Sequence, residues 1–243
     1  MTAAPRHSLI IPAYNEAALL PRLLSTVAAA RACYQGGAIE IIVADNGSTD
    51  ATAAIAHGAG CKVVSVSKRV IAAARNGGAA AASGEILSFV DADSRIHPET
   101  FNAIDQALAT GRVIGGATGV WLERWSPGLA ATYLLIIPVV VLTGMDTGVV
   151  FCRRSDFVLL GGYDERRRMA EDVAFLWALR GLGRSRGQRL TRLTTAKSVA
   201  STRKFDRYGD WHYFTQVIPS AMRALWRPEA VAELVERYWY QDR

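Results

Sequence analysis

Two pairs of acidic residues have the spacing and the context of groups that do chemistry. Asp91 and Asp93 are one residue apart and directly follow the apolar run at residues 86–90. Carboxylates that leave a buried strand together offer hard oxygen ligands to a divalent cation that bridges phosphates. Glu171 and Asp172 precede apolar residues at helical spacing, with Val173, Leu176 and Trp177 expected on the inner side of the helix. A carboxylate in the first turn of a helix is stabilised by the helix dipole, which is the structural alternative to a chemical role for this pair.

The elements that would position these residues are short apolar runs that alternate with helical patterns. Strands are predicted at residues 8–11, 39–44, 61–66 and 86–90. Helices are predicted at residues 16–31, from an N-cap at Ser48 or Thr49 through residue 57, and at residues 71–82. Apolar strands that alternate with helices are typical of a parallel sheet covered on both faces. The fold class is therefore α/β, with a mostly parallel central sheet flanked by helices.

Three of the predicted strands end in polar residues. These ends are residues 12–16, residues 45–48 and residues 91–93. Ligands of such sheets bind beyond the carboxyl ends of the strands. We therefore expect the three segments to converge on one site.

The positive charge of the chain is local. The formal net charge is +6, and nine of the 28 basic residues lie at positions 180–210, where only two residues are acidic. Neither a zinc-finger nor an RNP-type motif accompanies them, which argues against a nucleic-acid partner. A phosphate group is the better-suited anion. Arg203 and Lys204, expected on a loop, are the best-placed candidates to bind it, with a solvated basic surface as the alternative.

Over roughly residues 8–182 the chain resembles the inverting family 2 glycosyltransferases of the GT-A fold. Six segments in the family's order carry the resemblance: residues 10–16, 43–50, 74–78, 83–93, 161–165 and 171–172. Each segment alone is a weak signal, but their order makes the pattern specific. The QxxRW motif of processive polysaccharide synthases is missing, which favours a single sugar transfer.

The resemblance implies a nucleoside-diphosphate sugar as donor and Mg²⁺ or Mn²⁺ as cofactor. It places these residues at the donor, together with Arg203 and Lys204: Pro12, Tyr14, Asn15, Glu16, Asp45, Arg75, Asp91, Ala92 and Asp93. Asp93 would be the direct metal ligand, with Asp91 beside it and His212 as an additional candidate. Asp45 would accept a hydrogen bond from the base, and an Asx turn is the alternative role for its side chain.

The resemblance also implies the roles of the second acidic pair. Asp172, beside Glu171, would be the general base that removes the proton of an acceptor hydroxyl, and a single displacement would invert the anomeric configuration. A non-catalytic nucleotide-sugar-binding or scaffold protein with the same fold is the alternative. A nicotinamide-dependent dehydrogenase is disfavoured, because its fold needs a glycine-rich turn after the first strand, and residues 12–16 contain no glycine.

Two apolar segments bear on the acceptor and on membrane contact. Residues 129–145 carry no basic or acidic side chain and contain Pro138. We expect a buried helix there, with contact to a membrane surface as the alternative, and a hydrophobic or lipid-linked acceptor as the consequence of such a surface. Residues 228–240 predict an amphipathic helix that docks on the domain or on a second subunit of a homodimer, with contact to a membrane as the alternative.

We expect one glycosyltransferase domain with three parts. These are a donor half at about residues 8–110, an acceptor half at about residues 111–210 and a helical tail at about residues 211–243. The three cysteines are far apart in the sequence and no apolar leader is evident, which favours the cytoplasm, with the inner face of the membrane as a peripheral site.

Overall fold

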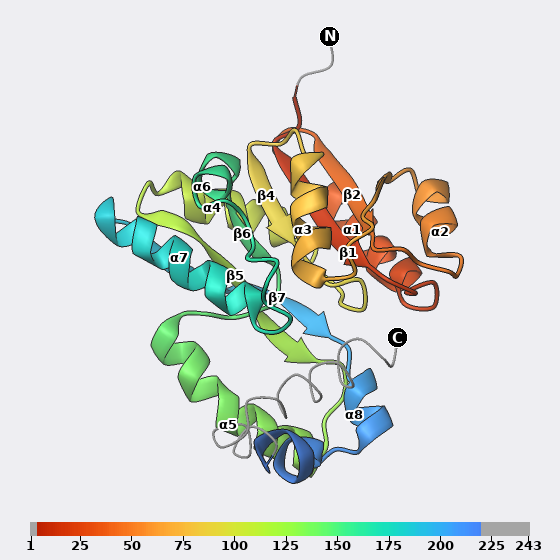
Figure 1. Cartoon of the computed structure of the whole chain (residues 1–243). Coiled ribbons are helices and arrows are strands. Elements are labelled where there is room, and N and C mark those ends of the chain that lie inside the picture. The colour runs from red at the N-terminus through yellow and green to blue at the C-terminus, as the bar shows by residue number, and fades with distance from the viewer. Residues whose placement is uncertain (1–3, 220–243) are drawn as a thin grey trace. The chain divides into compact units, whose positions relative to one another are not determined.

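The computed structural model describes residues 4–219 of the 243-residue chain (Figure 1). It groups the chain into two compact units. Among the described residues, unit 1 contains residues 4–121 and 144–200, and unit 2 contains residues 122–143 and 201–219. These limits differ from the three parts expected from the sequence. The helix predicted at residues 228–240 lies outside the described residues.

Unit 1 is built on a seven-stranded sheet with the strand order β3-β2-β1-β4-β6-β5-β7. The strands are β1 (His7–Ala13), β2 (Ile39–Asp45), β3 (Lys62–Ser65), β4 (Ile86–Phe89), β5 (Val113–Leu122), β6 (Val150–Arg153) and β7 (Arg189–Ala200). The first four strands are parallel, whereas β6 runs antiparallel to both β4 and β5. The mixed α/β fold with its central sheet confirms the predicted fold class.

Helices cover both faces of this sheet. They are α1 (Leu20–Cys33), α2 (Thr52–Gly58), α3 (Ile71–Ala80), α4 (Thr100–Ala109), α6 (Arg154–Leu159) and α7 (Glu171–Ser185). Successive side chains of a strand point to opposite faces. In β1, Leu9 and Ile11 accordingly join the core beneath α1 and α4, while Ile10 joins the core beneath α3 and α7. The run of fully buried residues in β1 results from this double coverage.

A glycine in helix α3 contacts the sheet at a point where a side chain would not fit. A Cβ atom on Gly78 would lie 2.5 Å from Cγ2 of Ile10 in β1, a distance at which one of the two must shift. Glycine normally destabilises a helix interior by about 1 kcal/mol relative to alanine. Here it allows the backbone of α3, and with it Arg75, to approach the strands.

Three local expectations were wrong. Helix α1 begins at Leu20 rather than near residue 16, and α2 begins at Thr52 with no side-chain cap from Ser48 or Thr49. The Ser48 hydroxyl and the Thr49 amide instead form hydrogen bonds with Asn15, in the segment that follows β1. Trp177, expected on the inner side of α7, is half exposed.

In unit 2, helix α5 (Pro127–Thr143) occupies the apolar stretch, with Pro138 inside it. The short helix α8 (Arg203–Tyr208) and a π-helical turn (Tyr213–Val217) follow β7. The stretch is helical as predicted, but its burial was predicted wrongly, because most side chains in its C-terminal half are exposed. Among the described residues, no helix is both long enough and apolar enough to cross a membrane.

Candidate active site

The strand order creates a crossover between β1 and β4. The chain proceeds from β1 to β2 and β3 on one side, then returns to place β4 on the other side of β1. Ligands of open α/β sheets bind beyond the carboxyl ends of strands at such a point. The segments after β1, β2 and β4 are the polar ends predicted from the sequence, so this edge of the sheet is the candidate site.

Hydrogen bonds tie the segment after β1 to the segment after β2. The Asn15 amide nitrogen donates to Oγ of Ser48 (3.0 Å), and its side-chain Oδ1 accepts from the Thr49 amide (2.8 Å). The Glu16 amide donates to Oγ1 of Thr52 (2.8 Å). Asn15 has a φ of 52°, a left-handed conformation that asparagine tolerates better than most residues. These bonds fix the positions of two of the three predicted donor segments.

Asp45 ends β2 with a buried side chain. Its Oδ1 accepts a hydrogen bond from the Ser48 amide (3.2 Å), so the turn around the carboxylate that the sequence suggested is present. No partner of Oδ2 is found within residues 4–219, and this oxygen is the atom that would accept a bond from a base. Nearby, Arg69 lies over the ring of Tyr14 at 4.0 Å from its centroid, while Pro12 is part of β1.

Arg75 connects the two acidic pairs. Its Nη2 donates to Oδ1 of Asp91 (2.9 Å), and its Nη1 donates to Oε1 of Glu171 (2.8 Å). The Arg75 side chain is only 7% exposed and lies over the Tyr163 ring, 5.2 Å from its centroid. One guanidinium thus joins the end of β4 to the start of α7. A contact between Arg75 and a nucleotide stays a prediction.

Burial and charge act against each other in this cluster. Burial alone would lower the pKa of Arg75, but the charges around it, chiefly that of Asp91, hold the pKa above its ordinary value. Burial raises the pKa of Glu171, and the Arg75 guanidinium opposes only part of that rise. Burial also raises the pKa of Tyr163. A buried carboxylate stays charged only while a partner compensates it, so Glu171 depends on Arg75.

Asn76, the neighbour of Arg75, fixes the segment that contains Tyr163. Its Oδ1 accepts from the Tyr163 amide (2.9 Å), and its Nδ2 donates to the Tyr163 carbonyl (2.9 Å) and to Oε1 of Glu165 (3.0 Å). Gly162 has a φ of 75°, and a Cβ there would lie 2.6 Å from Oδ1 of Asn76. Successive residues of α3 therefore hold both the acidic cluster and the turn beside it.

Asp91 and Asp93 lie in a turn after β4, closed by a bond from the Ser94 amide to the Asp91 carbonyl (3.0 Å). The Asp91 side chain is 53% exposed, Asp93 is half-buried, and Ala92 between them is buried. Within the described part of the chain, no cluster of three or more His, Cys, Asp or Glu side chains is placed to hold a metal ion. Two carboxylates still suit Mg²⁺ or Mn²⁺, because such ions take their remaining ligands from phosphates and water.

The second acidic pair opens α7, as predicted. Glu171 is buried, whereas Asp172 is half-buried and accepts a hydrogen bond from the Val173 amide through Oδ1 (2.8 Å). A base must reach the proton that it abstracts. Of the two acids, Asp172 is therefore the more accessible.

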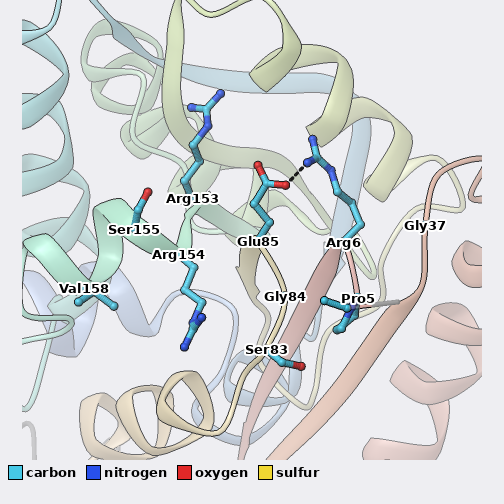
Figure 2. A pocket seen from close by; sticks show the side chains of 11 residues that line it. Pro5, Arg6, Gly37, Ser83, Gly84, Glu85, Arg153, Arg154, Ser155 and Val158 are labelled. Atoms are coloured by element: carbon cyan, nitrogen blue, oxygen red, sulfur yellow. Dashed lines mark hydrogen bonds and ion pairs between the residues drawn. The ribbon is translucent and has the colours of Figure 1, made fainter. Parts of the chain in front are cut away.

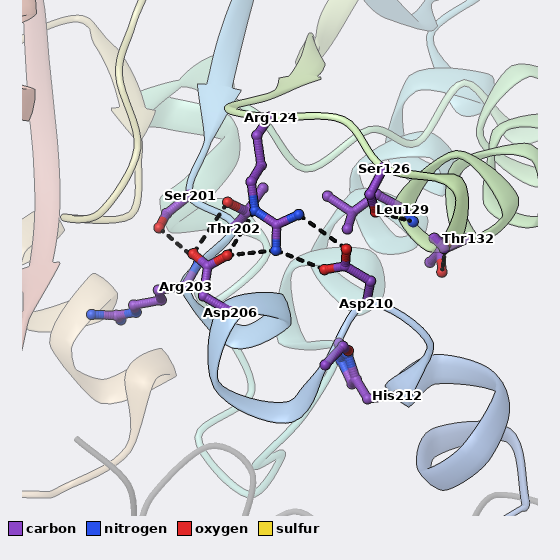
Figure 3. A network of polar contacts seen from close by, with 12 residues as sticks. Arg124, Ser126, Leu129, Thr132, Ser201, Thr202, Arg203, Asp206, Asp210 and His212 are labelled. Carbon is purple, nitrogen blue, oxygen red and sulfur yellow. Dashed lines mark hydrogen bonds and ion pairs between the residues drawn. The ribbon is translucent and has the colours of Figure 1, made fainter.

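Three further predicted residues belong to unit 2. Arg203 and Lys204 are the first residues of α8, so their expected position on a loop was wrong. His212 is buried, with Nδ1 2.8 Å from the Gly209 carbonyl oxygen and its ring packed against Phe205. Figure 3 shows the polar network beside them. A diphosphate contact for Arg203 and Lys204 and a metal contact for His212 stay predictions.

A hollow of about 890 Å³ lies at the opposite edge of the sheet (Figure 2). It is lined by residues that precede β1, β2 and β4, including Arg6, Gly37 and Glu85, and by Arg153 and Arg154 at the end of β6. Arg6 and Glu85 form an ion pair across it. A seven-residue strand is roughly 20 Å long, so the hollow is remote from the acidic cluster.

The family model of glycosyl transferase family 2 matches residues 8–127. The chain belongs to glycosyl transferase family 2. It is 35% identical over 118 residues to a validoxylamine A glucosyltransferase of Streptomyces hygroscopicus subsp. jinggangensis, a match that covers 43% of this chain and 26% of that protein. It is 36% identical over 123 residues to the undecaprenyl-phosphate 4-deoxy-4-formamido-L-arabinose transferase of Pseudomonas paraeruginosa, covering 45% and 34%. The chain thus spans about a third or less of these relatives.

Solved structures confirm the GT-A fold of this family 2 chain. The mannosyltransferase PcManGT from Pyrobaculum calidifontis, in complex with GDP-Man and Mn²⁺, superposes with a TM-score of 0.64 at 22% identity, covering 91% of this chain and 65% of that one. S. aureus TarS 1-349, in complex with UDP-GlcNAc, gives a TM-score of 0.58 at 18% identity, covering 82% and 59%. At these identities, the likeness concerns the fold.

The sequence did not reveal the bonds that join the motifs. Arg75 and Asn76 were noticed as a motif, but their partners Glu171 and Tyr163 are 96 and 87 positions away. The adjacency of a charged and an amide side chain on a glycine-rich helix was the available signal.

Proposed function

We propose that this chain transfers a sugar from a nucleoside-diphosphate donor to an acceptor hydroxyl, with Mg²⁺ or Mn²⁺ and with inversion. The observation that carries this proposal is the Arg75 bridge. It links Asp91, the predicted donor-side carboxylate, to Glu171, the neighbour of the predicted base. Family membership, the GT-A fold and the sugar nucleotides in the neighbouring structures support it.

The donor would lie beyond the carboxyl ends of β1, β2 and β4. Oδ2 of Asp45 would accept from the base, and the segment at residues 12–16 would line the nucleoside. Asp93, beside Asp91, would hold the cation. When bound, that cation would neutralise the charge on the diphosphate. Arg203 and Lys204 of unit 2 are proposed to add positive charge to the same group.

Asp172 would act as the base in a single displacement. It accepts the proton of the acceptor O–H group while that oxygen forms a bond to the anomeric carbon. The bond from this carbon to the diphosphate oxygen breaks at the same time, and the diphosphate leaves with the electron pair. Because the acceptor attacks opposite the leaving group, the configuration inverts. Arg75 keeps Glu171 charged and in place, and thereby fixes the first turn of α7.

We also propose a hydrophobic or lipid-linked acceptor. The Pseudomonas paraeruginosa relative is named for undecaprenyl phosphate, and helix α5 exposes an apolar surface. We further propose that the protein acts at the inner face of a membrane and that it forms a homodimer.

The donor site is tested by calorimetry with a panel of nucleoside diphosphates and Mn²⁺ or Mg²⁺. We expect one nucleotide to bind only with metal, and Asp93→Ala to remove that binding. Asp172→Asn should keep donor binding but lower the release of nucleoside diphosphate from the donor sugar by about 10²-fold or more. Glu99→Gln, an exposed carboxylate of the segment before α4, is the matched control and should leave both unchanged.

Two results would contradict the proposal. If none of the nucleotides binds with either metal, the donor site is wrong. If Asp172→Asn releases diphosphate at the wild-type rate, the base is wrong. A non-catalytic protein would bind the donor without any turnover in the wild type. The anomeric configuration of the product, read by NMR, decides on inversion.

A further inference from the structure

The C-terminal half of helix α5 is apolar over nine consecutive residues, and seven of them are exposed. Residues 134–142 read LLIIPVVVL. Leu142 is 85% exposed and Leu134 is 68% exposed. The N-terminal half behaves differently, because Leu129 and Thr132 are buried. The N-terminal end of α5 is thus packed within unit 2, and the C-terminal end carries exposed apolar side chains.

The exposed side chains cover more than half of the helix circumference, and the half-buried Ile137 and Val140 occupy the remaining sector. At about 100° per residue, Leu135, Ile136 and Val141 point about 100° to 140° apart, and all three are exposed. A helix that docks on a protein presents one apolar stripe, whereas a helix that is apolar all round needs an apolar medium on every side. The pattern favours a lipid phase over a flat protein partner.

The rest of unit 2 carries groups that suit a lipid headgroup layer. Trp125 is half exposed just before α5 and contacts Tyr133 edge-on, with 5.3 Å between the ring centroids. Tryptophan and tyrosine are enriched where a bilayer meets water. Trp211, near α8, is half exposed as well. Trp125, Tyr133 and Trp211 all belong to unit 2, the unit that contains α5.

An arginine fastens α5 to the basic helix α8. Arg124, three residues before α5, donates to both carboxylate oxygens of Asp210 (2.6 and 3.1 Å) and from Nε to Oδ1 of Asp206 (2.7 Å), as Figure 3 shows. Asp206 belongs to α8, which also contains Arg203, Lys204 and Arg207. Basic residues near an anionic lipid surface contribute about 1 kcal/mol each. The apolar helix and the cations are therefore held together within unit 2.

We propose that unit 2 docks on an anionic lipid surface by inserting the C-terminal half of α5 into one leaflet. The 17 residues of α5 extend about 25 Å, less than the roughly 30 Å of a hydrocarbon core, which fits insertion into one leaflet. Arg207 and its neighbours on α8 face the headgroups. The contact deepens the proposed function, because it places the enzyme where a lipid-linked acceptor is found.

The test is sedimentation of the full chain with vesicles of phosphatidylcholine, with and without phosphatidylglycerol. The decisive variant is Leu134→Gln/Leu142→Gln. The matched control is Val158→Gln/Leu159→Gln on α6, where the two apolar side chains are 68% and 62% exposed. We expect the wild type and the control to pellet with the anionic vesicles, and the α5 variant to partition about 100-fold more weakly. All three should have the same melting temperature, because the substituted side chains are exposed.

A fluorescent label distinguishes lipid from other occupants of α5. Leu142→Cys, in a Cys33→Ser background that removes the exposed native thiol, is labelled with an environment-sensitive dye. We expect a blue shift only when vesicles are added. A blue shift already present without vesicles would overturn the proposal, because the protein itself, through residues 228–240 or a second copy, would then cover α5.

Two more results would overturn the proposal. These are a wild type that stays in the supernatant with both kinds of vesicle, and an α5 variant that pellets like the wild type. Neither measurement uses a sugar nucleotide. A failure of vesicle binding therefore leaves nucleotide binding and sugar transfer to be judged separately, and a failure of nucleotide binding leaves vesicle binding intact.

Discussion

Replacing Arg75 by methionine removes the charge of the bridge while keeping an unbranched side chain. Glu171 then loses its cation at a site where its side chain is only 9% exposed. An uncompensated buried charge costs about 3–5 kcal/mol of the free energy of unfolding. Asp91 is 53% exposed, so water replaces its lost bond at little cost. The expected loss therefore comes almost entirely from Glu171.

The pH dependence of this loss identifies its cause. In Arg75→Met, the pKa of Glu171, already raised by burial, rises further. A carboxyl group with a raised pKa holds its proton in the folded state after the unfolded chain has released it, so stability falls as pH rises through that interval. The variant should be least stable near neutral pH and regain part of the loss in mild acid. Urea denaturation at both pH values measures it.

A second substitution provides the control. Arg75→Met/Glu171→Gln removes both charges and should recover most of the lost stability, because replacing a whole buried pair is often close to neutral. Arg75→Lys should be intermediate, since the single nitrogen of an ammonium cannot replace the two guanidinium nitrogens that bond to Asp91 and Glu171 separately. The reasoning is refuted if Arg75→Met unfolds with the wild-type free energy, or if Glu171→Gln fails to restore it.

Two further predictions concern stability. Burial lowers the pKa of His7 from its ordinary value of 6.5 to about 4. Between these pH values the unfolded chain binds a proton that the folded protein does not, so the free energy of unfolding should fall by about 3 kcal/mol as the pH drops from 6.5 to about 4. Denaturation of His7→Phe should lack that dependence, and an unchanged slope would contradict it. Gly162→Ala should lower stability by about 2–3 kcal/mol, through its positive φ and the clash with Asn76. Gly161→Ala, with the same φ but open space, should lose less in the same assay, and equal losses would show that the clash is irrelevant.

Local patterns predicted the elements because burial on both faces leaves a continuous apolar run. The strands at residues 39–45 and 86–89 and the helix that begins at Ile71 lie close to their expected positions. The start of α2 was wrong for a physical reason. Ser48 and Thr49 are good capping residues by type, but in the segment after β2 they form hydrogen bonds with Asn15 of the segment after β1 instead. A competing partner from another loop is not visible in a local pattern.

The surroundings of helix α5 show the same limit. Its apolar residues, with no charge among them, predicted a helix and an apolar environment. Whether protein, lipid or water contacts a given side chain depends on which segments pack around the helix. The structure buries Leu129 and exposes Leu142 in the same helix, although both are leucines in one uninterrupted apolar pattern.

The sequence by itself determined the family, the α/β class, and the two acidic pairs as the groups most suited to chemistry. These follow from residue types and short spacings, which one stretch of chain contains completely. Only the tertiary structure decided that Arg75 joins Asp91 to Glu171. The bond between Arg75 and Glu171 links residues 96 positions apart. It forms because the order of the strands and the close approach of α3 to β1 bring Arg75, Asp91 and Glu171 together.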